Sequence, residues 1–332
     1  CLYGLKKIEK KSNVVKNIYL YDSYSSISLK HDFHFSVDNK NQSLAYIIDS
    51  NNLFFNINKK LKSLKNINFL QKQILSINDN EFFKEITFLD LSKKNYNLLI
   101  FAATNNLYLF SKFNLRKIID KNYNENAYVF SLYHKKIINN SARQFFLKDG
   151  PLAFLPITST ETSVIWSIQN NSINNKYLSN KKYLLKFFKD HFNELFKDIV
   201  CLSKINKFNL NYIFSEFKNS KRTLLFGEIV NKIHPIAGQG WNMTLRNIFC
   251  LVKILKNYKD LGLEVGNDDF INKYLEEITA KNFTFSTLID VIRKIFDIKI
   301  DTYALIRKNL LSKLDKSFFI KKNFINIANK GF

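Results

Sequence analysis

Hydrophobic and polar residues alternate with a period of two near the start of the chain, as they do in half-buried β-strands. Residues 15–48 show this alternation and predict several strands, whose apolar positions are Tyr19, Tyr21, Ile27, Phe33 and Phe35. The spacing becomes helical over residues 50–64. Residues 66–118 predict short strands and turns, with a buried strand from Asn97 to Ala103.

The middle of the chain predicts three more strands: Ala127 to His134, Arg143 to Phe146, and Thr162 to Gln169. A helix follows from Lys181 to Lys197, with an apolar face made of Leu184, Leu185, Phe188, Phe192 and Leu195. Another strand is predicted near Leu210 to Lys218. Four large aromatic residues belong to this predicted sheet and occupy positions typical of its core: Phe145, Phe146, Phe154 and Trp166.

A strand, a loop, a Gly-rich turn and a helix follow one another between residues 222 and 258. The strand, Thr223 to Phe226, ends at Gly227-Glu228, and the helix has apolar spacing from Leu245 to Tyr258. Gly238 and Gly240 leave backbone amides uncovered where the helix dipole presents its positive end. Such an entry suits a negative or electron-rich edge of a ligand. The rest of the chain is expected to be helical.

The order of residues in this segment resembles the second flavin motif of FAD-dependent aromatic monooxygenases. Arg222 to Glu228, followed by His234-Pro235-Ile236-Ala237-Gly238-Gln239-Gly240-Trp241-Asn242, is most similar to the ubiquinone-biosynthesis hydroxylases of the 2-polyprenylphenol and 2-polyprenyl-6-methoxyphenol type. Phe145 to Pro156 resembles the substrate-domain strand of the same family, and Tyr46 to Asp49 the strand that enters its first inter-domain helix. All three prolines of the chain fall in the first two of these segments.

The resemblance implies a mixed α+β or α/β fold of the p-hydroxybenzoate-hydroxylase kind. In it, a flavin domain shortened at its N-terminus is interleaved with a substrate-binding β-sheet, and the C-terminus is helical. The implied divisions are 1–14 for the remnant of the first flavin-domain helices, 15–48 for substrate-domain strands, 49–118 for part of the flavin domain, 119–220 for the substrate sheet and its helix, 221–264 for the flavin motif, and 265–332 for C-terminal helices.

The same resemblance implies the chemistry. FAD would be held by Glu228 at the ribityl chain and by Pro235, Gly238, Gln239, Gly240 and Asn242 around the flavin ring. Glu228 could equally be a solvated carboxylate at the end of a strand. NAD(P)H or another donor would supply electrons, and a C4a-hydroperoxyflavin would hydroxylate a polyprenylated phenol with O2. No catalytic side chain and no metal are expected, because the cofactor performs the reaction. His234 is therefore expected to order the loop before Pro235 rather than to act as a base.

The chain departs from the family pattern at several points. It begins at Cys1, has only Gly4 near its start, and lacks the Gly-x-Gly-x-x-Gly turn that binds the ADP half of FAD. By comparison, roughly the first sixty residues are absent, about one βαβ unit. We therefore expect a fragment or the product of a truncated gene, which binds FAD weakly or not at all. Thr104-Asn105 replaces an acid-glycine pair, and Glu228 and Asn247 each stand where the family has Asp.

The net charge of +23 is high and allows two interpretations. A basic surface could meet anionic lipid or nucleic acid. Alternatively, the lysines reflect a biased composition rich in Lys, Asn, Ile and Phe, which their scattered positions favour. Cys1, Cys201 and Cys250 have no metal-binding spacing and predict reduced thiols.

The expected partners are the phenol substrate, O2 and a peripheral contact with a membrane or a ubiquinone-biosynthesis complex, without nucleic acid. The expected location is cytoplasmic, at the inner membrane. Apolar residues of the C-terminal helices could touch the lipid, such as Phe318, Phe319, Ile320 and Phe324, or could simply be packed. Two other functions remain open: a degenerate flavoprotein-like subunit that binds a partner or lipid without catalysis, and a basic nucleic-acid binder, against which the flavin motif argues.

Overall fold

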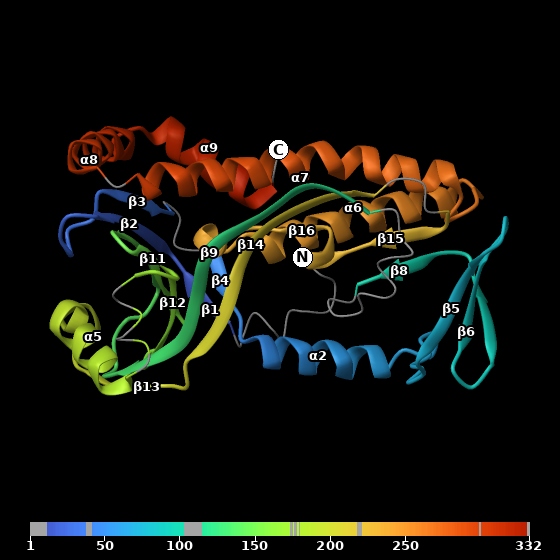
Figure 1. Cartoon of the computed structure of the whole chain (residues 1–332), viewed down its shortest axis with the longest axis horizontal. Helices are drawn as coiled ribbons and strands as arrows, with labels where there is room; N and C mark the ends of the chain where they lie inside the picture. The colour runs from blue at the N-terminus through green and yellow to red at the C-terminus, as the bar shows by residue number, and fades with distance from the viewer. Residues whose placement is uncertain are drawn as a thin grey trace. The chain divides into compact units, whose positions relative to one another are not determined.

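The computed structural model describes residues 12–37, 42–102, 115–172, 175, 178, 180–217, 221–298 and 300–330. The chain forms two compact units, each assembled from segments that are distant in sequence. Unit 1 contains Cys1–Asn68, Tyr123–Leu210 and Lys294–Ile325, and unit 2 contains Phe69–Asn122, Asn211–Arg293 and Asn326–Phe332. Figure 1 labels the elements of both units.

Unit 1 is built on a mostly antiparallel sheet. Its strands lie in the order β9-β12-β11-β10-β2-β3, and β13 pairs with β9. Their bounds are Leu115–His134 for β9, Glu161–Gln169 for β12, Gly150–Pro156 for β11, Ser141–Leu147 for β10, Asn17–Ser23 for β2, Phe33–Ser36 for β3 and Ile199–Leu202 for β13. The β10–β2 pair is parallel, which aligns Arg143 with Tyr19. Two short strands, β1 (Asn13–Val15) and β4 (Ala45–Ile47), form a separate antiparallel pair.

Helix α5 (Lys181–Phe196) covers one face of this sheet, as Figure 1 shows. The Asn180 side chain caps its first turn by accepting hydrogen bonds from the amides of Lys182 and Tyr183. Its buried face meets the alternate inward residues of the strands in one aromatic core, which includes Phe145, Phe154, Trp166, Phe188 and Phe192. The predicted helix is therefore confirmed, and the core positions of Phe145, Phe154 and Trp166 are confirmed with it.

The predicted strand from Arg143 to Phe146 is confirmed as part of β10, and the segment from Phe145 to Pro156 that resembles the family also contains a second strand, β11. β10 and β11 form a hairpin that turns at Lys148-Asp149, with Leu147 paired to Gly150. Gly150 has a φ of +132°, and a Cβ there would lie 2.1 Å from the carbonyl oxygen of Ser167. β9 is also longer than predicted. Its first half was not predicted because many of its residues are polar.

Three further helices contribute to unit 1: α2 (Ser50–Lys62), α8 (Asp301–Asp315) and the start of α9 (Phe318–Lys330). α8 is joined to β2 by an ion pair between Arg307 and Asp22, both buried. On the same face, the ring of Phe146 stacks on that of Phe296 near the end of α7 (Asp268–Asp297). Phe146 is thus also a core residue, as predicted.

Unit 2 contains the Gly-rich motif. β15 (Thr223–Leu225) pairs in parallel with β8 (Leu99–Phe101). The chain continues through the short 3-10 helix η1 (Gly227–Ile229), β16 (Asn231–Lys232), the 3-10 helix η2 (Pro235–Ala237) and α6 (Gly240–Asp260). β16 pairs with β14 (Asn206–Phe217), and a separate antiparallel sheet contains β5 (Ile74–Asp79), β6 (Lys84–Phe88) and β7 (Lys93–Tyr96).

Helices α6 and α7 lie side by side in Figure 1 and share the core of this unit with β15. The core includes Leu224, Phe226, Ile254, Phe270 and Tyr274. The predicted order of strand, loop, turn and helix is confirmed, and so is the helical character of the described C-terminal residues. The predicted strand from Asn97 to Ala103 is shorter, and of its residues in β8 only Phe101 is buried.

Candidate functional site

The motif begins with a buried parallel strand that ends in a turn. Thr223, Leu224 and Leu225 are buried, and the amide of Phe226 donates to the carbonyl of Phe101 at 2.9 Å. Gly227 then takes a φ of +86°, a left-handed conformation that favours glycine. The turn places Glu228 at the surface, where 67% of its side chain is exposed. Its Oε2 lies 4.0 Å from Nζ of Lys232.

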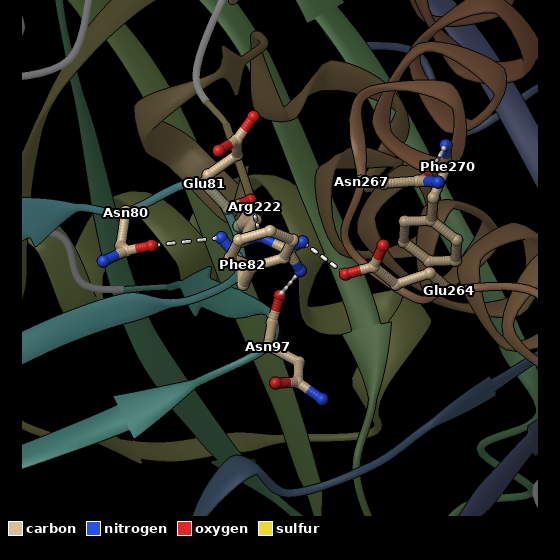
Figure 2. A network of polar contacts seen from close by, with 8 residues as sticks. All are labelled: Asn80, Glu81, Phe82, Asn97, Arg222, Glu264, Asn267 and Phe270. Atoms are coloured by element: carbon tan, nitrogen blue, oxygen red, sulfur yellow. Dashed lines mark hydrogen bonds and ion pairs between the residues drawn. The ribbon is translucent and has the colours of Figure 1, made fainter.

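A buried arginine fixes the start of this strand, as Figure 2 shows. Arg222 has a φ of +53°, and its Nε donates to the carbonyl of Glu81 at 3.1 Å. Nη1 donates to the carbonyl of Asn97 at 3.2 Å, and Nη2 pairs with Glu264 in the loop between α6 and α7. The guanidinium thus joins three segments that sequence spacing does not relate. The sequence identifies Arg222 only as part of the motif and does not predict that it links these segments.

His234 orders the loop before the turn. Its side chain is buried, and its Nδ1 accepts a hydrogen bond from the amide of Ile236 at 3.1 Å. Pro235 begins η2 with its fixed φ, and the amide of Gly238 donates to the carbonyl of Pro235 at 2.8 Å. Gly238 ends the short helix with a φ of +59°. This is the arrangement of a structural histidine, in agreement with the sequence interpretation.

The N-terminus of α6 has an open backbone. No side chain caps it, and its first turn has no acidic residue. Asn242 donates from Nδ2 to Oε1 of Gln239 at 3.1 Å, so these two side chains bind each other across the first turn. A Cβ on Gly238 would meet nothing within 4 Å, and one on Gly240 would meet only Cγ1 of Ile233 at 3.7 Å.

These contacts decide how Gly240 is interpreted. Contact at 3.7 Å is ordinary van der Waals distance, so the described protein leaves room for a side chain at this position. Its φ is not in the left-handed region, unlike that of Gly238. Neither packing nor backbone conformation therefore requires a glycine at 240. The positive end of the α6 dipole and its first amides face this open surface.

Behind the turn, the helix is anchored in a small apolar cluster. Met243 packs with Phe285 and Ile289, and Ile233 and Ile236 of the loop pack against them. The guanidinium of Arg246 lies 4.5 Å above the ring of Phe285, and burial lowers the pKa of Arg246. The loop and the helix entry are thus held by one set of contacts. Thr104-Asn105, one of the departures from the flavin pattern, lies outside the described residues.

The described ranges contain no group of three or more His, Cys, Asp or Glu side chains placed to hold a metal ion. Within the same ranges, none of the helices combines the length and the apolar character needed to cross a bilayer.

The comparison with known families agrees with the motif. The family described as squalene epoxidase matches residues 107–325, more than half of the chain. The chain belongs to the squalene epoxidase family. This match covers β9 to the start of α9, and therefore the whole Gly-rich motif and the unit 1 sheet without its strands β2 and β3.

The chain is also similar to curated proteins whose names refer to ubiquinone or ubiquinol. The ubiquinone biosynthesis monooxygenase COQ6 of Xenopus tropicalis is 24% identical over 257 residues, which cover 67% of this chain and 55% of the relative. The 3-demethoxyubiquinol 3-hydroxylase of Escherichia coli is 24% identical over 174 residues, covering 51% of this chain and 43% of the relative. The chain spans about half the length of the curated relatives it matches.

Solved structures show the fold. The p-nitrophenol 4-monooxygenase PnpA of Pseudomonas putida superposes with a TM-score of 0.77 at 10% identity, covering 98% of this chain and 84% of that one. HpxO of Klebsiella pneumoniae, solved with FAD and uric acid, gives 0.69 at 11% identity and covers 99% and 84% of the two chains. The predicted fold class, that of the p-hydroxybenzoate-hydroxylase-like FAD monooxygenases, is confirmed.

Proposed function

We propose that this chain supplies the flavin-ring site and the substrate sheet of an FAD-dependent monooxygenase that hydroxylates a polyprenylated aromatic ring in ubiquinone biosynthesis. Gly240 is the observation that supports it most directly, because the described protein itself does not require a glycine there. Gly238 and Gly240 would let the backbone of the α6 entry approach the flavin ring, and Pro235, Gln239 and Asn242 would border it. When bound, FAD would activate O2 for transfer of a hydroxyl group to the substrate, with electrons from NAD(P)H or another donor.

The residues of this chain would position the bound flavin and shield it. The α6 dipole and the amides of residues 240–242 would stabilise negative charge at the ring edge that they face. Glu228 lies at the end of β15, where a ribityl chain could reach it, and its exposed carboxylate is free of strong ion pairing at 4.0 Å from Lys232. His234 holds the loop and transfers no proton in this proposal.

Substitution of Gly240 tests the flavin site. Gly240→Ala and Gly240→Val should keep the fold, because a Cβ has room beside Ile233, but should weaken FAD binding at least about tenfold by blocking approach to the amides. FAD fluorescence quenching measures binding, and thermal unfolding measures the fold. Asn267→Ala, which removes the hydrogen bond from the amide of Phe270 at the start of α7, is a control that leaves the site intact.

One result would contradict the proposal. Equal and measurable FAD affinity in wild type and Gly240→Val would show that the loop is only a structural turn.

We also propose that the protein meets its isoprenoid substrate at a membrane surface through α8 and α9 of unit 1. Large apolar side chains of these helices are exposed: Leu305, Ile306, Leu310, Phe318, Phe319 and Phe324. Exposed lysines lie among them, at positions 313, 316 and 322. Apolar residues beside basic ones are typical of helices that lie in the interface of an anionic bilayer.

A further inference from the structure

Arg143 is a half-buried cation with neutral partners. It lies on β10 in unit 1, and its Nε is buried without a hydrogen-bond partner. The partners that the described residues give this guanidinium are the carbonyl oxygen of Ser141, at 3.4 Å from Nη1, and the hydroxyl of Tyr21. Neither is an anion. A partly desolvated charge is costly without an opposite charge, and these contacts within the described residues give the guanidinium no negative partner.

Two histidines share the surroundings of Arg143. Register pairs Arg143 with Tyr19 on β2, and Tyr19 with His34 on β3. The guanidinium carbon lies 5.7 Å from the centroid of the Tyr19 ring, and the His34 ring stacks on the same ring at 4.4 Å. The exposed ring of His31 lies 5.0 Å from that of Tyr19. Three basic side chains thus surround one tyrosine ring.

The inner side of this cluster is closed and apolar. Tyr21 stacks on Phe145 at 4.0 Å, and both belong to the core under α5. The carboxylate beside His34 is already engaged: Asp315 accepts from the backbone amide of His34 at 2.6 Å and pairs with Lys321 at 2.8 Å. His31 is exposed, and Tyr19 and Arg143 are only partly buried, so a small ligand can approach these side chains from solvent, although Nε of Arg143 itself is buried.

We propose that Arg143, His31 and Tyr19 form a binding site for a small oxyanion, a carboxylate or phosphate group. The planar guanidinium offers two parallel donors to such a group, and the imidazole of His31 adds a third. The Tyr19 ring contacts both basic groups, and the closed core below keeps the anion at the surface. The site belongs to unit 1 and does not depend on the flavin proposal.

Proton NMR of the histidine rings tests the site with inorganic phosphate as the probe, and acetate as a second one. The chain has five histidines, and His31→Asn and His34→Asn assign the two that matter. Phosphate added at constant pH and constant ionic strength should shift the signals of His31 and His34 with saturation. The signals of the other three histidines should stay unchanged.

Two substitutions at Arg143 separate binding from folding. Arg143→Met should raise the dissociation constant for phosphate at least about tenfold, because it removes the charge and both donors. Arg143→Lys keeps the charge and should give an intermediate loss, since an ammonium cannot bind in the same forked geometry. Lys186→Met removes one exposed charge from α5 in the same unit and should change nothing.

Thermal unfolding confirms that each variant is folded. Arg143→Met should melt no lower than wild type in the absence of anion, because it relieves an unpaired charge. Equal shifts in all five histidines, shifts without saturation, or unchanged binding in Arg143→Met would each overturn the site. Loss of the same size in Lys186→Met would show that only the overall charge attracts phosphate.

Discussion

Arg307 binds Asp22 through two parallel hydrogen bonds, Nε to Oδ2 at 2.6 Å and Nη2 to Oδ1 at 3.0 Å, although 285 positions separate the two residues. Both side chains are almost fully buried, and Nη1 of Arg307 also donates to the carbonyl of Ile295 at 3.0 Å. The guanidinium lies over the ring of Phe296. This one side chain therefore joins α8, the end of α7 and β2.

Arg307→Met should lower the free energy of unfolding of unit 1 by about 3–5 kcal/mol, because it leaves the Asp22 carboxylate buried without its partner. Urea denaturation followed by circular dichroism measures the loss. Lys308→Met is the control: its neighbouring ion pair with Asp32 is 3.8 Å long and half exposed on the lysine side, so the change should stay within about 1 kcal/mol. A loss below about 1 kcal/mol in Arg307→Met would contradict this assignment.

Gly266 and Gly262 give a matched pair in the loop between α6 and α7. Both have positive φ, +92° and +67°, but only Gly266 approaches another segment: its added Cβ would lie 2.2 Å from the carbonyl oxygen of Asn97. Gly262→Ala should cost about 1 kcal/mol from backbone strain alone. Gly266→Ala should cost about 2–4 kcal/mol, since the loop must also move away from Asn97. Thermal unfolding compares them, and equal losses would show that the close approach is unimportant.

The sequence predicts local elements of this fold well and its long-range contacts poorly. The helix of residues 181–196 and the turn at Gly238 follow from spacing and residue type, which are local properties. The hairpin at Lys148-Asp149 could have been predicted, because Asp-Gly is a strong turn signal, but the apolar residues on both sides of it obscure the turn. The ion pairs of Arg222 and Arg307 had no local signal at all.

The candidate site divides in the same way. Glu228 and residues 235–242 could be predicted as a candidate site because a motif is a local pattern, and the structure places them between the end of β15 and the first turn of α6. The pattern did not predict the contacts that hold these residues in place, made by Arg222 before β15 and by Arg246 over the ring of Phe285. These contacts join segments brought together only by the fold, so spacing along the chain cannot reveal them.

The pKa of His34 gives a prediction about pH. Burial, together with the charges of His31 and Lys321, lowers this pKa below its ordinary value of 6.5, while Asp315 opposes the shift. The folded protein thus binds fewer protons than the unfolded chain between the two pKa values. The contribution of neutral His34 to stability is complete above about pH 6.5 and is lost as pH falls through the folded-state pKa.

Two substitutions should move this pKa in opposite directions. Lys321→Met should raise it and Asp315→Asn should lower it further, as followed by the NMR titration of the His34 ring. His34→Asn should make the unfolding free energy less dependent on pH between about 5 and 7. Lys322→Met, one position along α9, is the control for Lys321→Met. A His34 pKa at or above the ordinary value in wild type would refute the assignment.

The proposed membrane surface predicts which phenylalanines matter. Phe318 and Phe319 on α9 are 67% and 72% exposed, and Phe54 and Phe55 on α2 of the same unit are 70% and 66% exposed. Because the two pairs are similarly exposed, comparing them distinguishes specific membrane binding through α9 from nonspecific binding through any exposed phenylalanine. Replacing Phe318 and Phe319 with Ser should weaken binding to vesicles of mixed zwitterionic and anionic phospholipids at least about tenfold, since burying one such ring contributes about 1.5–3 kcal/mol. The Phe54→Ser, Phe55→Ser variant should bind like wild type.

Binding should also weaken with rising salt, because each lysine near an anionic surface contributes about 1 kcal/mol that ions screen. Co-sedimentation with the vesicles measures all three proteins. A greater loss in the α2 variant would move the surface to α2, and no sedimentation of wild type at low salt would remove the membrane contact from the proposal.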